Sequence, residues 1–580
     1  MTSHTMKHPP PRQRHAAWPL LAALLGWALV GSVLANPAPA AAPGAAPAAD
    51  PGAAAVLATV PKPSKSTADH SKFKELKGPF ASGSEVTKAC LSCHTEAGKQ
   101  VMGTRHWTWE YTNPDTGQKL GKKTMLNSFC IGDRSNEAFC QSCHIGYGWK
   151  DQKFDFHDET KVDCLVCHHT GGYKKPAGLA GEVATERMER PDLPPGSGKF
   201  LDPVDLAMVA KHVGKTSTAN CGTCHYNGGG GDGVKHGDLD SSLNKATKEL
   251  DVHLASKANG GAGFTCATCH QSDGHQLAGS RISMTASDPH GPMLRGDTVH
   301  AGRNAATCQS CHGDKPHQQP SLAVGLLNNH TNKLACQSCH IPEFARGGVS
   351  TKMAWDWSTA GKMDAAGKPI EIKDEHGHVT YTSKKGDFKL AKNVVPEYVW
   401  FNGKVNFTTQ DMKIDPTQVL KVNSFMGSPD DPKARIWPVK RFEGKQPYDK
   451  VHLQLLVPHT ATPDDTAFWF NFDWDKALKA GATATGQPYS GQHGFVKTEM
   501  LWPITHMVAP SKSAVACASC HTSADQSRLG DLPGVYLPAR NHHAWIDRLG
   551  WLAVVGALGG VFVHAIARIV TGRRNATGAH

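Results

Sequence analysis

The chain has 580 residues, of which 39% are apolar and 58 are glycine, and its formal net charge is +11. This composition predicts that the polypeptide alone would make a thin apolar core. Three of the positive charges, Lys7, Arg12 and Arg14, lie in a predicted export signal, and setting them aside lowers the net charge to +8.

The first 67 residues are predicted to be a signal peptide followed by a tether. The basic start precedes an apolar stretch over residues 16–30 and a small-residue cleavage site, Val33-Leu34-Ala35, which indicates a signal peptide over residues 1–35. An uncleaved anchor is the alternative, but Pro19 and the small-residue exit favour cleavage. Residues 36–67 are rich in Ala and Pro, lack aromatic residues and are predicted to be a flexible tether. We therefore expect the chain to function in the periplasm.

Sixteen of the seventeen cysteines fall into eight C-x-x-C-H units. Random placement of Cys and His at their frequencies in this chain would give about 0.03 such units. The units are Cys90, Cys93 and His94; Cys140, Cys143 and His144; Cys164, Cys167 and His168; Cys221, Cys224 and His225; Cys266, Cys269 and His270; Cys308, Cys311 and His312; Cys336, Cys339 and His340; and Cys517, Cys520 and His521.

Covalent haem attachment explains every position of this motif. The two thiols form thioethers to the porphyrin, and the following His is an axial iron ligand. Zinc sites do not require a His directly after the second Cys of each pair. Disulfide frameworks and thioredoxin-like pairs do not repeat the five-residue C-x-x-C-H pattern either. Eight haems are therefore predicted. Each ferric haem with two ionised propionates adds one negative charge, which brings the net charge to about zero, so nucleic-acid binding gains no support.

The spacing of the units predicts the domain organisation. Seven units lie within residues 68–347, a predicted seven-haem core, and the eighth lies in a segment over residues 501–544. Between them is a haem-free region, residues 348–500, in which the β-branched and aromatic segments 378–383 and 398–408 indicate strands. Because haem must supply much of the core, we expect a multihaem cytochrome c fold: mainly short helices and long loops packed around a haem chain, with few strands.

Each iron needs a second axial ligand, for which 25 histidines outside the motifs are available. Those in Gly-, Asp- or Pro-containing loops are the preferred candidates: His106, His236, His253, His290, His300, His330 and His506. The competing candidates are His157, His169, His212, His275, His317 and His459.

A 19-residue apolar run over residues 549–567 would rise roughly 28 Å as a helix, enough to cross a bilayer core. We predict a transmembrane helix over residues 545–570. Arg568, Arg573 and Arg574 place the tail, residues 571–580, in the cytoplasm, and Trp545 and Trp551 lie at the opposite entry. His564 inside the run suggests a quinone or membrane subunit as partner, for example a quinol-oxidising cytochrome b, although a His near the helix end can also reach the interface.

The sequence resembles the tetrathionate reductase family of octahaem cytochromes c over nearly the whole mature chain. The matching stretches are His106-Trp107, residues 127–130, 146–158 and 162–168, Val213-Gly214-Lys215, residues 228–240, Trp355-Asp356-Trp357-Ser358, and residues 396–403 and 502–510. The resemblance implies that the second haem keeps one coordination position open, is ligated by a lysine outside its own unit, and has an unpaired cysteine nearby. Transferred to this chain, the lysine is Lys215, with Lys150 and Lys153 as rivals, and the cysteine is Cys130.

Two functions follow as expectations. The first is a membrane-anchored reductase that passes electrons to the second haem and reduces tetrathionate to thiosulfate, with nitrite and hydroxylamine as further candidate substrates. The second is a non-catalytic conduit with eight closed haems, which carries electrons between a quinol-oxidising membrane partner and a soluble acceptor.

Overall fold

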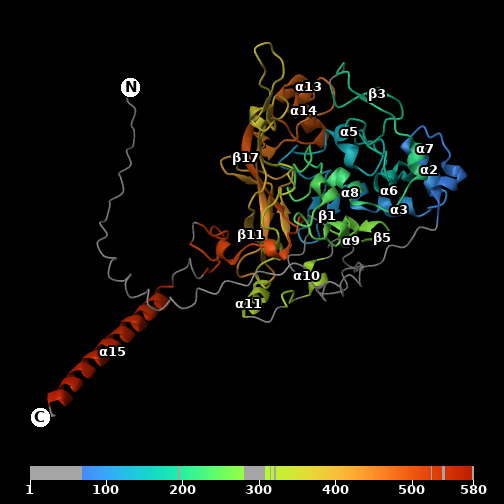
Figure 1. Ribbon diagram of the computed structural model, residues 1–580. Helices are drawn as coiled ribbons and strands as arrows, with labels where there is room; N and C mark the ends of the chain where they lie inside the picture. The colour runs from blue at the N-terminus through green and yellow to red at the C-terminus, as the bar shows by residue number, and fades with distance from the viewer. Residues whose placement is uncertain are drawn as a thin grey trace, which may run out of the picture. The chain divides into compact units, whose positions relative to one another are not determined.

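The computed structural model describes residues 68–193, 196–279, 307–313, 315–318, 322–523, 526–537 and 543–577. The predicted signal peptide and tether, and the candidate ligands His290 and His300, lie outside these ranges. Figure 1 shows the described residues as two kinds of structure: short helices in the first half of the chain and a large sheet in the second half.

The haem-motif half is built from short helices joined by loops, as predicted. Most are a single turn, which is too short for a stable isolated helix, so their stability depends on packing and on haem attachment. One helical turn brings Cys at i, Cys at i+3 and His at i+4 to one face, which is what haem attachment needs. The helices of this half are α2 (Gly83–Leu91), α3 (Ala97–Met102), α4 (Arg105–Thr108), α5 (Glu137–Cys140), α6 (Leu165–His168), α7 (Leu206–Lys211), α8 (Thr218–His225), α9 (Cys266–Cys269), α10 (Cys308–His312), α11 (Leu322–His330) and α12 (Gln337–His340). Its strands are two-residue pairs: β1 (Tyr111–Thr112) with β2 (Lys119–Leu120), β3 (Met188–Glu189) with β4 (Phe200–Leu201), and β5 (Ser272–Asp273) with β6 (Gln276–Leu277).

The region between the seventh and eighth units forms a nine-stranded sheet with the order β13-β17-β15-β7-β10-β9-β8, and β11 and β16 also pair with β15. A separate pair joins β12 and β14. The strands are β7 (Thr351–Asp356), β8 (Glu371–Lys373), β9 (Val379–Thr382), β10 (Gly386–Ala391), β11 (Glu397–Phe401), β12 (Val405–Phe407), β13 (Leu420–Lys421), β14 (Asn423–Phe425), β15 (Arg435–Asp449), β16 (Gln454–Leu455) and β17 (His493–Pro503); the helices of this region are α13 (Phe468–Asn471) and α14 (Trp474–Thr485).

The expectation of few strands is wrong for this region, although the strands predicted near residues 379–382 and 397–407 are present. The reason is that the region has an apolar core of its own. Trp355, Trp357, Phe442 and Trp502 are almost fully buried in one cluster with other aromatic and aliphatic side chains of the sheet. The sheet therefore does not depend on haem for its core, unlike the motif helices.

The sheet holds the loop that precedes the second haem unit. The indole of Trp357 donates to the carbonyl of Phe129 at 2.7 Å, and the Gln446 amide donates to the carbonyl of Asn127 at 2.8 Å. The ring of Phe129 packs 4.4 Å from that of Phe442 on β15. These contacts fix Cys130, the next residue, relative to both halves of the structure.

Helix α15 (Ala544–Thr577) contains a 29-residue segment, Ala544–Gly572, that is long and apolar enough to cross a membrane. All of its side chains that the structure describes are exposed. The predicted boundaries, residues 545–570, fall within this segment.

Candidate haem sites and active site

Six histidines of the C-x-x-C-H units each face a histidine from elsewhere in the chain. The ring centroids of these pairs are 6.0 to 6.4 Å apart. The pairs are His94 with His70, His225 with His106, His270 with His506, His312 with His253, His340 with His317, and His521 with His330.

This spacing fits two imidazoles on opposite faces of one haem iron. An imidazole nitrogen lies about 2 Å from a first-row metal and the ring centre about 1 Å further out, so two axial rings have centroids roughly 6 Å apart. His376 and His378 also lie 6.1 Å apart, but they are near neighbours in the chain and neither belongs to a motif. The six motif pairs are therefore candidate bis-His haem sites.

The third unit has a candidate partner in His275. Its Nδ1 is 2.8 Å from the Gln100 side-chain oxygen, which leaves Nε2 available for a metal. Burial is the main cause that lowers the pKa of His275, and electrostatic repulsion from His168 is the next. The Nδ1 of His168 is itself bonded to the carbonyl of Gly214 at 2.9 Å, so its Nε2 is also available.

The structure thus brings four of the preferred candidates, His106, His253, His330 and His506, to motif histidines. His275 and His317 come from the competing group. His70 was missed because it lies just after the tether, next to no motif. The other candidates lie elsewhere: His236 is edge-on to Trp502, His459 bonds to Asp464, His212 bonds to the carbonyl of Met208, His169 packs against Tyr173, and His157 is exposed.

Contacts between cysteines of different units give the order of the haem sites. The thiols of Cys90 and Cys164, of Cys143 and Cys224, of Cys221 and Cys266, and of Cys308 and Cys336 are close enough to shift each other's pKa. Cys167 with Cys221, Cys269 with Cys311, and Cys339 with Cys520 are within electrostatic reach. The sites therefore follow the order 1-3-4-5-6-7-8, and site 2 branches from site 4.

The second unit departs from this pattern at His144. The His144 Nε2 lies 2.7 Å from the carbonyl of Trp107, and its Nδ1 is buried without a hydrogen-bond partner among the described residues. Burial lowers the pKa of His144 to about 3, so the ring is neutral. Five aromatic rings surround it, at centroid distances of 4.7 to 6.2 Å: Trp107, Trp109, Trp149, Phe154 and Phe156. The ring of His144 is thus held in an aromatic cage, and its ligation of iron stays a prediction.

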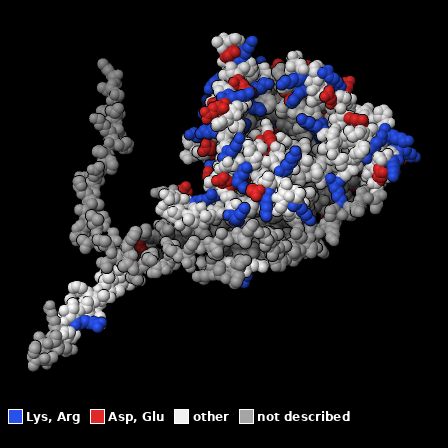
Figure 2. All heavy atoms as spheres, viewed as in Figure 1, with Lys and Arg blue, Asp and Glu red and all other residues white. Residues whose placement is uncertain are grey.

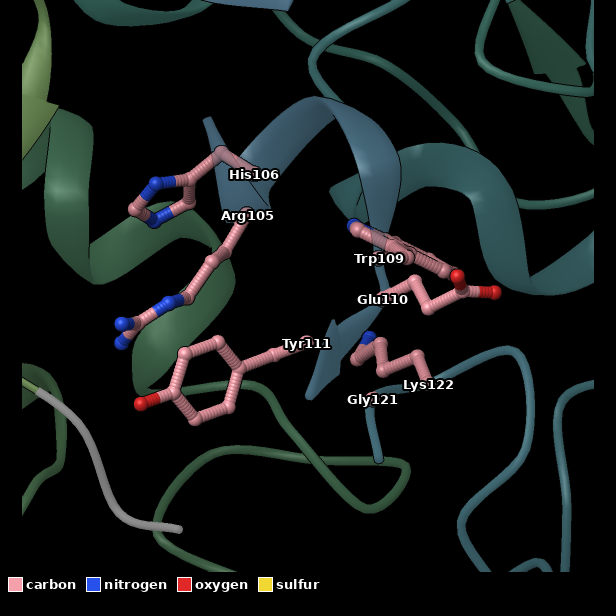
Figure 3. Close-up of a pocket in the computed structure, with 7 residues that line it drawn as sticks. All are labelled: Arg105, His106, Trp109, Glu110, Tyr111, Gly121 and Lys122. Carbon is pink, nitrogen blue, oxygen red and sulfur yellow. The ribbon is translucent and has the colours of Figure 1, made fainter. Parts of the chain in front are cut away.

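Lys122 is one of three lysines that lie near the second unit, together with Lys123 and Lys175. It lines a cavity of about 200 Å³ together with Arg105, His106 and Trp109 (Figure 3). Its amino nitrogen lies 4.3 Å from the centre of the Trp109 ring and 3.9 Å from a carboxylate oxygen of Asp133. Its side chain is 42% accessible.

The charge state of Lys122 depends on its neighbours. Burial opposes its charge, but Asp133 and then the thiols of Cys143 and Cys140 outweigh burial and raise its pKa. Haem attachment converts these thiols into neutral thioethers, which leaves Asp133 as the main group that favours the charged form. A bound iron would compete with the proton for the amine.

Lys215, the lysine predicted from the resemblance, is placed elsewhere. Its side chain is exposed, and the carbonyl of the preceding residue, Gly214, accepts from His168 of the third unit. The rivals Lys150 and Lys153 are exposed as well. Lys215 therefore stays a prediction, and Lys122, which no motif marks in the sequence, is a further candidate for the lysine of the second haem.

Cys130 lies near Cys140 of the second unit, together with two lysines that the sequence did not single out. Burial raises the pKa of the Cys130 thiol, and nearby Lys385 and Lys352 oppose this shift. Lys352 is on β7 and Lys385 is in the turn between β9 and β10. Lys385 is fixed by its carbonyl, which accepts from the Trp355 indole at 2.6 Å.

Both lysines are held in apolar surroundings. The Lys352 amino nitrogen lies 3.9 and 3.5 Å from the ring centres of Trp355 and Phe388, and the Lys385 nitrogen lies 5.0 Å from that of Trp469. Burial, and then repulsion by Lys385, hold the pKa of Lys352 well below its usual value. Burial also lowers the pKa of Lys385. Figure 2 shows a hollow with basic side chains at its rim on the side between β17 and α5.

A buried network holds the backbone that follows the second unit. Lys175 donates to the carbonyls of His144 and Gly146 at 2.5 and 3.0 Å and lies 3.0 Å from Asp163. Its side chain is 1% exposed and that of Asp163 is not exposed. Tyr147 donates to Asp163 at 2.8 Å and contacts Tyr173 at 2.9 Å. The position of His144 therefore depends on this ion pair.

The substitution Lys175→Met should destabilise the protein strongly. It leaves the Asp163 carboxylate buried without its cation, which costs about 3–5 kcal/mol of unfolding free energy. Urea melting of the haem-loaded protein, followed by tryptophan fluorescence, measures this loss. The neighbouring exposed residue gives the control, because Lys174→Met should change stability by no more than about 0.5 kcal/mol. Equal midpoints for both variants would contradict the role of the pair.

The paired imidazoles and the eight motifs define a multihaem c-type cytochrome, and comparison with known proteins agrees. A bacterial cytochrome c family matches residues 352–524. The crystal structure of an octahaem cytochrome c from Shewanella oneidensis is similar over 82% of this chain and 98% of its own, with 40% identity and a TM-score of 0.68. Comparison with curated proteins gives no match. The chain belongs to the octahaem cytochromes c, and its haems are bound covalently.

Proposed function

We propose that the chain is a reductase in which eight haems deliver electrons to the second haem, where tetrathionate is reduced to thiosulfate. One observation carries the proposal: six motif histidines face a histidine from elsewhere in the chain and His168 has a candidate partner in His275, whereas His144 is caged and Lys122 lies near Cys140 and Cys143 of the second unit. A haem with one lysine ligand keeps a coordination position for substrate, which bis-His haems lack.

The surrounding residues suit a dianion. Tetrathionate takes up two electrons, its central S–S bond breaks, and two thiosulfate dianions leave. When bound, the second haem supplies these electrons and an open iron position. Lys352 and Lys385 place positive charge in apolar surroundings, where electrostatic attraction is strong. Because burial raises its pKa, Cys130 remains a thiol, and it donates a hydrogen bond to the bound anion.

Turnover with an artificial donor tests the proposal. The purified full chain, with reduced methyl viologen as donor, should oxidise two viologens and form two thiosulfate ions for each tetrathionate consumed. Nitrite and hydroxylamine also fit an open iron position, and their kcat/KM values in the same assay decide between the substrates. A chain that turns over none of the three is the electron conduit and not a reductase.

Substrate affinity should depend on pH. A lysine binds a dianion in its charged form, and the lowered pKa values of Lys352 and Lys385 mean that charge is lost at a pH where ordinary lysines keep it. The KM for tetrathionate should therefore rise with increasing pH. Lys352→Met should raise KM roughly tenfold or more at low pH and weaken this dependence. Lys389→Met, at an exposed position of β10, is the control. A pH profile unchanged in Lys352→Met would contradict the assignment.

We further propose that α15 anchors the protein on the periplasmic side of the membrane, where c-type cytochromes typically function. Truncation after Arg540 should release a soluble protein with eight haems and unchanged viologen-driven turnover, because α15 contributes no residue to the site. Only quinol-driven turnover should be lost. Haem content and both rates measure this, and loss of haem or of viologen-driven turnover would mean that the helix has a further role.

A further inference from the structure

We propose that electrons enter the haem array at the eighth haem, from a membrane-embedded quinol-oxidising protein that docks over residues 517–523 and 526–537. A quinol gives up two electrons and two protons, and the electrons pass to ferric haem. The proposal rests on the anchoring of α15 but not on the identity of the substrate.

The haem order identifies two terminal sites. Site 1 is in contact with site 3, and site 8 is within reach of site 7, so sites 1 and 8 are the two ends of the main chain of haems. Of the sixteen motif cysteines, only Cys93 of site 1 and Cys517 of site 8 are exposed. The α2 helix, with Cys90, and the α11 helix, with His330, lie well apart in Figure 1. Sites 1 and 8 are therefore the two accessible ends at which an external donor can deliver electrons.

The chain that follows the eighth unit ties this end to the membrane helix. Leu529, Leu532 and Leu537 are buried in one cluster with Trp400 and Ile436 of the sheet, and Cys520 packs against the same cluster. Helix α15 begins at Ala544, seven residues after Leu537. Seven residues span at most about 25 Å even when fully extended. The eighth haem is thus held close to the point where the chain meets the membrane.

Electron tunnelling falls steeply with distance, so a donor embedded in the membrane must reach a haem edge near the bilayer. Site 8 satisfies this condition through the chain itself. Tyr536, which is 62% exposed, and Trp545, which is 68% exposed, stand on either side of the short connection and offer aromatic surface to a membrane partner. Site 2, reached through site 4, is then the exit of the path.

Two changes near the eighth site, each with a matched control near the N-terminal end of the chain, test the proposal. Methionine raises the potential of a haem relative to histidine, so His330→Met should retain electrons at the eighth haem and slow quinol-driven reduction of the other haems at least about tenfold. His70→Met makes the same change at the first haem and should leave that rate unchanged. The measurement is stopped-flow absorbance of haem in membrane vesicles from cells that make the full chain, with menadiol as donor and no tetrathionate.

The second change leaves every haem intact. Insertion of about 20 Gly and Ser residues between Leu537 and Ala544 lowers the effective concentration of the eighth haem at the membrane, and the menadiol-driven rate should fall about eightfold. The same insertion in residues 36–67 is the control and should have no effect. Reduced methyl viologen should reduce all variants at the wild-type rate, and each should keep eight haems. A menadiol-driven rate unchanged by either change at the eighth site, or slowed equally by His70→Met, overturns the proposal. Because the readout is haem reduction, failure of the reductase assignment would not affect this result.

Discussion

Lys122→Leu should abolish turnover while leaving eight haems attached. The thioethers of Cys140 and Cys143 hold the second haem whatever its axial ligand, so haem content should not change. Loss of the groups that only orient a metal ligand costs about 10–100-fold in activity, so loss of the ligand itself should cost at least about 100-fold. Viologen-driven tetrathionate reduction measures turnover, and the absorbance of the reduced protein measures haem content.

The matched control is Lys215→Leu, because Lys215 is exposed and lies beside the third unit. It should keep wild-type turnover and the wild-type signal of the second haem. The reverse pattern, with Lys215→Leu inactive and Lys122→Leu active, would show that the ligand is Lys215, as the resemblance implied. Lys122→His is also informative, since a shorter, rigid ring cannot follow the path of the lysyl chain to the same point.

Cys130→Ala should lower turnover about 100-fold, as removal of one hydrogen-bond donor from a water-excluded site commonly does. The thiol is the one cysteine outside the motifs, and the contacts of residues 127–129 with Trp357, Gln446 and Phe442 hold it in place. Because those contacts are made by neighbouring residues, the substitution should leave the fold intact. Steady-state kinetics of the purified variant gives the effect on kcat.

Ser128→Ala is the control for Cys130, because it changes a buried side chain two residues away whose hydroxyl has no hydrogen-bond partner among the described residues. Its kcat should be close to wild type. Alkylation gives a second readout: iodoacetamide should add at most one label to the haem-loaded protein, at Cys130, and tetrathionate should slow the labelling. Wild-type turnover in Cys130→Ala, or labelling that tetrathionate does not affect, would show that the Cys130 thiol does not contact the substrate.

The motif residues were predictable because haem attachment fixes their spacing within a single helical turn. The histidines that pair with the motif histidines were harder to predict. His253 and His506 lie in loops as expected, whereas His106 lies in α4 and His330 ends α11. His70 and His317 meet their partners only through the tertiary fold. Pairing between distant residues leaves no local signal in a single sequence. The branched order of the sites could not be predicted either, because it also arises from tertiary contacts.

The lysine proposed for the second haem shows this limit most clearly. Lys122 lies 18 residues before Cys140, in a loop without a recognisable pattern, and only the fold brings it to the second unit. His144 has the same sequence context as the other motif histidines, yet the aromatic residues around it, which come from separate segments, take it out of the pattern. The sheet was underestimated because average composition hides the concentration of tryptophan and phenylalanine in residues 348–500.

Electron paramagnetic resonance of the oxidised full chain tests most directly whether the second haem is open. The structure predicts seven low-spin haems with two histidine ligands each and one distinct haem whose signal changes on addition of nitrite or cyanide. The distinct signal should be absent from Lys122→Leu in its native form and retained in Lys215→Leu. Eight low-spin bis-His haems, none of which responds to added ligand, would contradict the reductase and identify the protein as an electron conduit.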